Sequence, residues 1–311
     1  MKLKKIALAV GLASCVAAGT SQATVLATAM IEMDNFVLKG SDGEILDYGD
    51  DFSSISYTST ADWDITFDSA TDSQTNPGST TGVDLTHGCL GASCDPIGEN
   101  MFPVISGAGL GNFAGADQIE EGSPLANHPG LDVGARVANI SAASIETGEH
   151  AASANSNNNL NANWTFELTQ DTGITFEFDY RAYLEAYVTA DEQSPGFATA
   201  NYAFYFEIVD LSAGGTSVFK LEPDLLNHSI SLNAPLPFDI QSTGGLHTIG
   251  TATVGSLSVS TDTLTAGKLY QLSARINTNA DVSRIPEPAA LLLMGAGLLG
   301  MGAARRKRKA A

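Results

Sequence analysis

The stretch Ile174-Thr-Phe-Glu-Phe-Asp-Tyr-Arg-Ala-Tyr-Leu-Glu-Ala-Tyr-Val188 decides the fold class of this chain. Starting from Ile174, every second side chain is apolar or aromatic, and the positions between them carry polar, charged or tyrosine side chains. Successive residues of a β-strand point to opposite faces of the sheet. The alternation therefore predicts an antiparallel strand with one buried and one solvated face.

A second run with the same period follows at Tyr202, Phe204, Phe206 and Ile208. The sequence Ser194-Pro-Gly196 between the two runs is typical of a turn. Two alternating runs joined by a turn predict a β-hairpin. We therefore expect these two strands to be neighbours in one sheet.

Shorter alternating runs continue on both sides of this region, separated by turn residues such as Gly, Asp, Ser and Asn. Many short strands with such turns are typical of a sandwich or a barrel, and no repeat has the spacing of a solenoid or propeller. The sequence predicts an all-β fold, an antiparallel β-sandwich with jelly-roll-like connections. The additional runs lie at 31–38, 52–58, 63–67, 218–221, 230–232, 247–261 and 268–277.

The segment 68–163 is rich in Gly, Ala, Ser and Asn and has few large apolar residues. It includes the run Asn155-Ser-Asn-Asn-Asn159. This composition predicts long loops and short edge strands, and the segment is a possible divider between two subdomains. Within it, Gly134 to Ile145 is compatible with a strand or with a short helix.

The N-terminus has the layout of a secretory signal peptide. Three lysines within residues 1–5 precede an apolar stretch at 6–18 and the sequence Ser21-Gln-Ala23. We expect a signal helix in residues 1–23 and cleavage after Ala23. The sequence Leu12-Ala-Ser-Cys15 resembles a lipobox and leaves an alternative, in which Cys15 is lipidated and becomes the new N-terminus.

The C-terminus combines a proline-rich junction, an apolar stretch and a basic cluster. The uncharged stretch 289–304 follows Pro286-Glu287-Pro288, and as a helix its 16 residues would rise about 24 Å. A bilayer core is about 30 Å thick, and basic side chains at the helix end can reach the headgroups. We expect a single transmembrane helix with its basic end in the cytoplasm and the body outside. The basic residues are Arg305, Arg306, Lys307, Arg308 and Lys309.

These three parts, in this order, resemble a PEP-CTERM sorting signal over residues 285–309. The resemblance implies that a membrane enzyme, exosortase, cuts near Pro286-Glu287-Pro288 and releases or re-anchors the exported body. It also implies a Gram-negative bacterium that makes extracellular polysaccharide. A permanent C-terminal anchor is the alternative reading of the same tail.

Three segments follow from these signals: a signal peptide at 1–23, an exported body at 24–284 and a sorting tail at 285–311. Without residues 1–23 and 289–311 the chain retains 7 Lys and Arg against 35 Asp and Glu, a formal net charge of −28. So acidic a body argues against nucleic acid and anionic membrane surfaces as partners.

Cys89 and Cys94 remain as a pair once the signal peptide is removed, and in an oxidising compartment such a pair predicts a disulfide. Zinc bound by His87 and both cysteines, with His128 or His150 as fourth ligand, is the alternative. Structural calcium is a further possibility, because carboxylates gather in several predicted loops. Those carboxylates are Asp42 with Glu44, Asp47 with Asp50 and Asp51, and Asp62 with Asp64, none at EF-hand spacing.

The predicted solvated face of the 174–188 strand offers a candidate for polysaccharide contact. Exposed Tyr183 and Tyr187 would stack on sugar rings through their apolar faces. Glu177, Asp179 and Glu185 on the same face suggest the alternative of glycoside hydrolysis, which needs two carboxyl groups across a cleft.

Linear motifs of a nucleophile elbow or a phosphate-binding loop are absent from the sequence. This absence, together with the terminal signals and what the resemblance to a PEP-CTERM tail implies, predicts an exported, non-enzymatic protein of the cell surface or exopolysaccharide matrix, with an adhesive or structural role and no cofactor. The alternative is a secreted carbohydrate-active enzyme on a jelly-roll scaffold.

Overall fold

The computed structural model describes residues 24–107, 109–146, 153–188, 196–233 and 247–284. The predicted signal helix at 1–23 and the predicted transmembrane helix at 289–304 lie outside these ranges. Within the described ranges, no helix has the length and apolar composition that crossing a bilayer requires.

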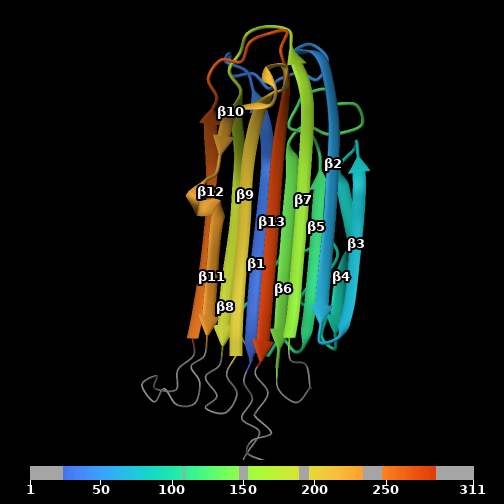
Figure 1. Cartoon of the computed structure of the whole chain (residues 1–311), viewed down its shortest axis with the longest axis vertical. Helices are drawn as coiled ribbons and strands as arrows, with labels where there is room; N and C mark the ends of the chain where they lie inside the picture. Colours follow the sequence, from blue (N-terminus) through green and yellow to red (C-terminus); the bar gives the residue numbers. More distant parts are fainter. Residues whose placement is uncertain (1–23, 108, 147–152, 189–195, 234–246, 285–311) are drawn as a thin grey trace, which may run out of the picture.

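The described residues form an all-β fold of two antiparallel sheets, as the sequence predicts, whose strands run along the long axis of the molecule (Figure 1). The inner faces of the two sheets enclose a shared apolar core. The jelly-roll connectivity stays a prediction. In spatial order the six-stranded sheet contains β12 (His247–Ser260), β8 (Thr175–Val188), β1 (Val25–Lys39), β6 (Ala135–Ile145), β5 (Phe113–Glu121) and β4 (Val83–Gly91). The seven-stranded sheet contains β10 (Thr216–Leu221), β9 (Gly196–Asp210), β13 (Leu269–Arg284), β7 (Ser153–Leu168), β2 (Phe52–Phe67) and β3 (Ala70–Ser79), with β11 (Asn227–Asn233) paired to β9.

The alternation in residues 174–188 predicts the buried face of β8 correctly at Phe176 and Phe178, which lie in the core. The predicted hairpin between β8 and β9 is wrong, because β8 pairs with β1 and β12 whereas β9 belongs to the opposite sheet. The two strands meet across the core, where the rings of Phe176 and Phe206 lie 5.0 Å apart. Alternation indicates which face of a strand is buried, but it does not determine which strands pair with it in the sheet.

The prediction of loops and edge strands for 68–163 is correct for β3 and β4, which are edge strands, and for the long connection after Gly91, but wrong for the rest of the segment. This segment supplies β3, β4, β5 and β6 and most of β7. Strands β5, β6 and β7 are internal members of the same two sheets as the rest of the body, so the segment does not divide it. The stretch that was compatible with strand or helix forms β6.

Small and amide side chains replace large apolar ones at the inner positions of β7, which explains why this strand is hard to recognise. Ala154, Ser156 and Asn158 all point inward and are buried. Ser156 Oγ donates to the carbonyl of Gly115 at 2.7 Å, and Asn158 Nδ2 donates to the carbonyl of Asp117 at 2.8 Å. Buried polar groups are tolerated when they are hydrogen-bonded in this way.

The first and last described strand ends lie at the same end of the sandwich (Figure 1). Arg284 of β13 is paired with Gly196, whose Cα lies against Val25 at the start of β1. We call this the terminal end. The loops at 40–51, 169–174 and 261–268 lie at the opposite end, where the β1, β7 and β12 strands finish.

Candidate functional site

Residues 92–107 and 109–112, which we call the strap, lie between β4 and β5 in the sequence and cover part of the outer face of the six-stranded sheet. Their apolar side chains form a second core with that face. The strap contributes Ile97, Phe102 and Ile105, and the sheet contributes Leu26, Met30, Phe113, Ile119, Ala138, Ile140, Ala142, Tyr183 and Tyr187.

Polar contacts fix the strap to the sheet. Arg181 Nη2 donates to the carbonyl of Phe102 at 2.9 Å, and the Arg136 guanidinium lies 5.4 Å from the centre of the Phe102 ring. Both arginines are paired with the buried carboxylate of Glu32, at 2.6 and 2.8 Å. Further along, the N–H of Gly107 donates to Glu185 at 3.0 Å. The strap is therefore held by charge-assisted bonds as well as by burial.

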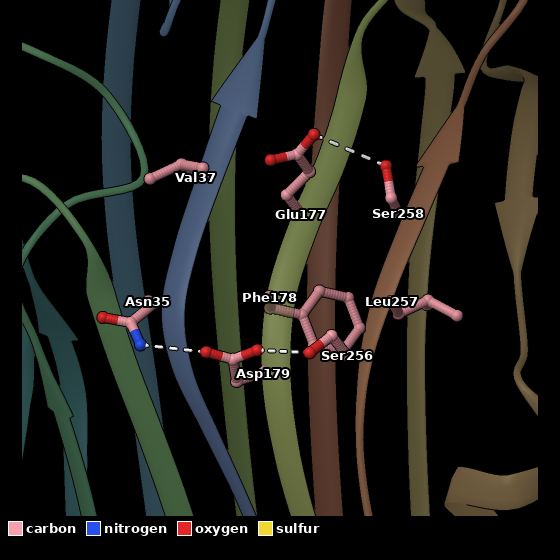
Figure 2. A pocket seen from close by; sticks show the side chains of 8 residues that line it. All are labelled: Asn35, Val37, Glu177, Phe178, Asp179, Ser256, Leu257 and Ser258. Atoms are coloured by element: carbon pink, nitrogen blue, oxygen red, sulfur yellow. Dashed lines mark hydrogen bonds between the residues drawn. The ribbon is translucent and has the colours of Figure 1, made fainter.

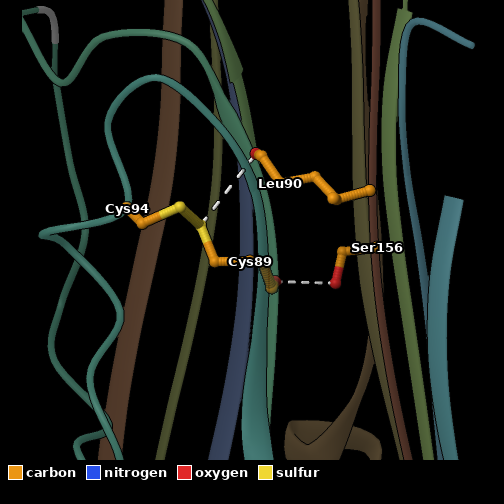
Figure 3. Close-up of a disulfide and its surroundings, with 5 residues drawn as sticks. Cys89, Leu90, Cys94 and Ser156 are labelled. Carbon is orange, nitrogen blue, oxygen red and sulfur yellow. Dashed lines mark hydrogen bonds between the residues drawn. A yellow bond between two sulfur atoms is a disulfide. The ribbon is translucent and has the colours of Figure 1, made fainter. Parts of the chain in front are cut away.

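A disulfide joins Cys89 of β4 to Cys94 at the root of the strap, with an S–S distance of 2.01 Å (Figure 3). Because thiolates are what bind zinc, this bond removes both proposed cysteine ligands. His87 Nδ1 lies 2.8 Å from Glu99, and His128 Nδ1 lies 2.8 Å from Ser123 Oγ. The remaining candidate ligand, His150, lies outside the described residues.

The acidic clusters proposed for calcium lie on strands and loops of the described body. Asp47 accepts hydrogen bonds from the backbone of Gly49 and from Asn127, which hold its pKa below the ordinary value. Asp62 accepts from Asn159 at 3.0 Å. In the described part of the chain, no three His, Cys, Asp or Glu side chains converge as a metal site would require. Calcium binding stays a prediction.

The strap overturns the predicted polysaccharide contact through Tyr183 and Tyr187. These side chains are only 7% and 4% exposed, and Glu185 between them is 2% exposed. The Tyr183 hydroxyl donates to the Glu185 carboxylate, and burial raises the pKa of that tyrosine. The alternation predicts a solvated face correctly only where no other segment covers the strand. The apolar residues Ile97, Phe102 and Ile105, in an otherwise loop-like sequence, are the signal that could have indicated that this segment packs over the strand.

We expect Tyr183→Ala to destabilise the fold, because the truncation leaves a cavity between the strap and the sheet. The expected loss in the free energy of unfolding is about 3 kcal/mol. Val254→Ala, at a side chain that is 76% exposed on the neighbouring strand β12, is the control and should cost under about 0.5 kcal/mol. Urea unfolding of both variants measures the difference. Equal losses would show that Tyr183 is not covered.

Asp117 is a carboxyl group buried beneath the strap. It is 0% exposed, its Oδ2 has no hydrogen-bond partner, and the strap residues Asn100 and Glu99 lie close to it. Burial raises its pKa to about 7. The folded protein therefore holds a proton on Asp117 at pH values where the unfolded chain has lost it.

This proton makes stability pH-dependent. The unfolded carboxyl ionises near pH 4 and the folded one near pH 7, so the free energy of unfolding falls as pH rises across that window. We expect Asp117→Asn to remove a decrease on the order of 2 kcal/mol. Buried Glu120, whose pKa is also raised by burial, retains a decrease of the same sign. Urea titrations at several pH values, with exposed Asp72→Asn as control, provide the measurement; an unchanged pH slope in Asp117→Asn contradicts the assignment.

A shallow groove of about 440 Å³ lies beside the strap, between β1, β8 and β12 (Figure 2). A β-bulge in β1 shapes it: Asn35 has φ of 53°, a left-handed conformation that asparagine tolerates. Asn35 Nδ2 and Ser256 Oγ both donate to the Asp179 carboxylate, at 3.1 and 2.5 Å. Glu177, on the same strand, is paired with Lys39 at 2.6 Å.

The groove brings together two of the three carboxylates that suggested a glycoside hydrolase. Glu177 and Asp179 line it, whereas Glu185 lies under the strap. Hydrogen bonds from Ser256 and Asn35 lower the pKa of Asp179, so this group stays ionised. A general acid needs a raised pKa. Asp179 therefore does not have the raised pKa that a general acid requires.

The outer face of the seven-stranded sheet carries an ordered set of asparagines. The sequence analysis did not predict this set, because it assigned residues 155–159 to a loop-rich segment. Alternate residues of β7 point outward and are half-buried, and most of them are asparagine. Asn277 Nδ2 on β13 donates to Asn159 Oδ1 at 2.6 Å and to Asn157 Oδ1 at 3.2 Å. The period of two in residues 155–163 was the available signal. We call this surface the asparagine face; it comprises Asn155, Asn157, Asn159, Asn161 and Asn163 of β7, Asn277 and Asn279 of β13, and Asn201 of β9.

The predicted sorting tail begins where the last strand ends. Strand β13 finishes at Arg284, one residue before Ile285 and the Pro286-Glu287-Pro288 motif. The motif, the basic cluster at 305–309 and the predicted cleavage site at Ala23 all lie outside the described residues. In the sequence, the tail is thus attached to the sandwich without an intervening linker.

Comparison with known families identifies the tail. Residues 284–309 match the model of the PEP-CTERM protein-sorting motif, as the resemblance predicted. The motif implies export, processing by an exosortase and a location at the cell surface or outside the cell.

Other comparisons add little. No curated protein matches the chain. A structure of infectious bursal disease virus Gt strain is 10% identical, over 89% of this chain and 85% of that chain, with a TM-score of 0.08. The VP2 subviral particle of infectious bursal disease virus is 11% identical, over 85% and 79%, with a TM-score of 0.08. TM-scores this low carry no argument about fold or function.

Proposed function

We propose that this chain is an exported, exosortase-processed, non-enzymatic protein that serves as an adhesive or structural component of the cell surface or exopolysaccharide matrix. The observation that carries the proposal is the PEP-CTERM motif at residues 284–309, which starts at the last residue of the last strand. The entire sandwich is then the cargo that the tail delivers.

The body has properties that suit such a destination. The formal net charge of −28 over residues 24–288 keeps it soluble and self-repelling. The disulfide suits an oxidising exterior. The first and last described strand ends both lie at the terminal end, so a membrane-held precursor would present the opposite end and the broad faces outward. None of these features requires a reaction.

Fractionation of cells tests the proposal. In a Gram-negative host with an exosortase and an exopolysaccharide, we expect the mature protein in the surface and matrix fractions. In an isogenic strain that cannot make the polysaccharide, we expect most of the protein in the medium instead. Quantitative immunoblotting of the three fractions measures this shift. An unchanged distribution between the two strains contradicts a matrix role.

A second assay separates the non-enzymatic proposal from its alternative. Mature protein purified from the surface is incubated with the exopolysaccharide of the same strain, and newly formed reducing ends are counted. We expect none above a heat-inactivated control. Release that Glu177→Gln or Asp179→Asn abolishes would instead support a hydrolase in the groove.

A further inference from the structure

We propose that the asparagine face binds a neutral polysaccharide, whose hydroxyl groups exchange hydrogen bonds with the outward amides of β7 and its neighbours. This inference rests on the proposed function, because export is what brings the face to a polysaccharide. It goes further in naming the surface and the chemical class of the ligand.

The amides form a two-dimensional lattice. Asn159 lies directly opposite Asn277, and Asn157 lies opposite Asn279, which in turn lies opposite Asn201. Neighbouring strands are about 4.8 Å apart, and alternate residues repeat about every 6.7 Å along a strand. Strands β2, β7, β13 and β9 run side by side for most of the length of the molecule (Figure 1). A lattice with two regular spacings suits a polymer that repeats its hydroxyl groups.

Hydrogen bonds within the lattice fix the amides in place. Asn277 donates to Asn159 at 2.6 Å, Asn159 donates to Asp62 at 3.0 Å, and Asn201 donates to Asn279 at 3.3 Å. Each amide has two N–H donors and an oxygen with two acceptor sites, so these bonds use only part of its capacity. Amides that are already oriented lose little conformational freedom when a ligand binds.

Two asparagines keep their whole side-chain capacity for a ligand. Among the described residues, the amides of Asn155 and Asn161 make no side-chain hydrogen bond, and both are half-buried on the outward side of β7. Asn161 is aligned with Arg275, whose guanidinium lies 5.3 Å from the centre of the Tyr205 ring. That half-buried ring gives the lattice an aromatic border on which a sugar can stack.

Charge selects a neutral polymer over an anionic one. The outward positions of β7 from Ser153 to Thr165 carry no charge, although residues 24–288 together have a net charge of −28. The field of such a body repels a polyanion, whereas a neutral glycan only exchanges hydrogen bonds with water for bonds with amides. The face therefore matches a neutral chain in both charge and hydrogen-bonding groups.

Retention on insoluble polysaccharides tests the inference. The probes are cellulose and insoluble starch as neutral polymers and alginate beads as the anionic one, with mature protein purified from the surface. We expect retention on at least one neutral probe and at least about tenfold less on alginate. The triple variant Asn155→Ala, Asn157→Ala and Asn161→Ala should bind the neutral probe at least about tenfold more weakly, since three amides that would bond the glycan are removed.

The matched control carries Ser256→Ala and Ser258→Ala in the groove of the other sheet and should bind like the parent protein. Both variants must first show the parent's thermal midpoint; single-site variants replace the triple if it does not. Failure on both neutral probes overturns the inference, as does an unaffected triple variant or an equal loss in the control. Self-association that the triple variant abolishes, without glycan retention, also overturns it, because the face would then bind a second copy.

The outcome is separable from that of the proposed function. Retention that depends on the asparagine face, in a protein that is absent from the matrix fraction, leaves the inference standing and removes the proposed function. If the protein is in the matrix fraction but its retention on glycan does not depend on these residues, the proposed function stands and the inference about the asparagine face fails.

Discussion

Replacing Pro286, Glu287 and Pro288 with alanine should block removal of the C-terminal tail and leave the exported protein in the membrane fraction. The tail is then an uncut stretch of 16 uncharged residues ahead of five basic ones, which holds a body that has crossed the membrane. We expect the surface and secreted fractions to lose at least about 90% of the protein, since a tenfold change needs only about 1.4 kcal/mol of lost recognition.

The body offers a matched control for this variant. Glu222-Pro223 repeats part of the motif in an exposed turn after β10, where Glu222 forms a solvent-exposed ion pair with Lys220. Changing both residues to alanine should leave processing unaffected. If the tail variant is released as well as the control, the motif does not direct cleavage.

Phe206→Ala should lower the free energy of unfolding by about 3–5 kcal/mol, the cost of a large cavity in a packed core. The Phe206 ring lies 5.0 Å from the ring centres of both Phe36 and Phe176, so it fills the space between the two sheets. Tyr205 is the adjacent residue and points to the opposite, solvated face.

Tyr205→Ala is therefore the matched control and should cost about 1 kcal/mol, through lost contacts with Arg275 and Lys220. Calorimetric melting or urea unfolding compares the two. Similar losses for neighbouring residues would contradict the two-sided burial of β9, and with it the sandwich.

The fold class was predictable from the sequence because large apolar residues mark the inner positions of β8 and β9. Which strands are neighbours was not, since Phe176 and Phe206 make the same contact whether their strands pair or face each other across a core. Strand β7 was missed because the small or polar residues Ala154, Ser156 and Asn158 fill its inner positions. Ser156 Oγ and Asn158 Nδ2 donate to backbone carbonyls of β5, which the sequence alone does not reveal.

The candidate sites divide in the same way. The sorting tail is a linear motif, so it can be recognised from the sequence without knowledge of the tertiary structure. The burial of Tyr183 depends on the strap, which folds over it from about 80 residues earlier in the sequence. The asparagine face depends on the pairing of β7 with β13, since one strand alone shows only a polar repeat.

We propose that the tail is a sorting signal that is cleaved from an acidic β-sandwich. Intact-mass analysis of the native protein tests this cleavage most directly. The measurement uses the surface and secreted fractions together and reads both termini. We expect a chain that starts at Thr24 and ends near Pro286-Glu287-Pro288. A single species in both fractions that still ends at Ala311 would contradict it and make the tail a permanent anchor.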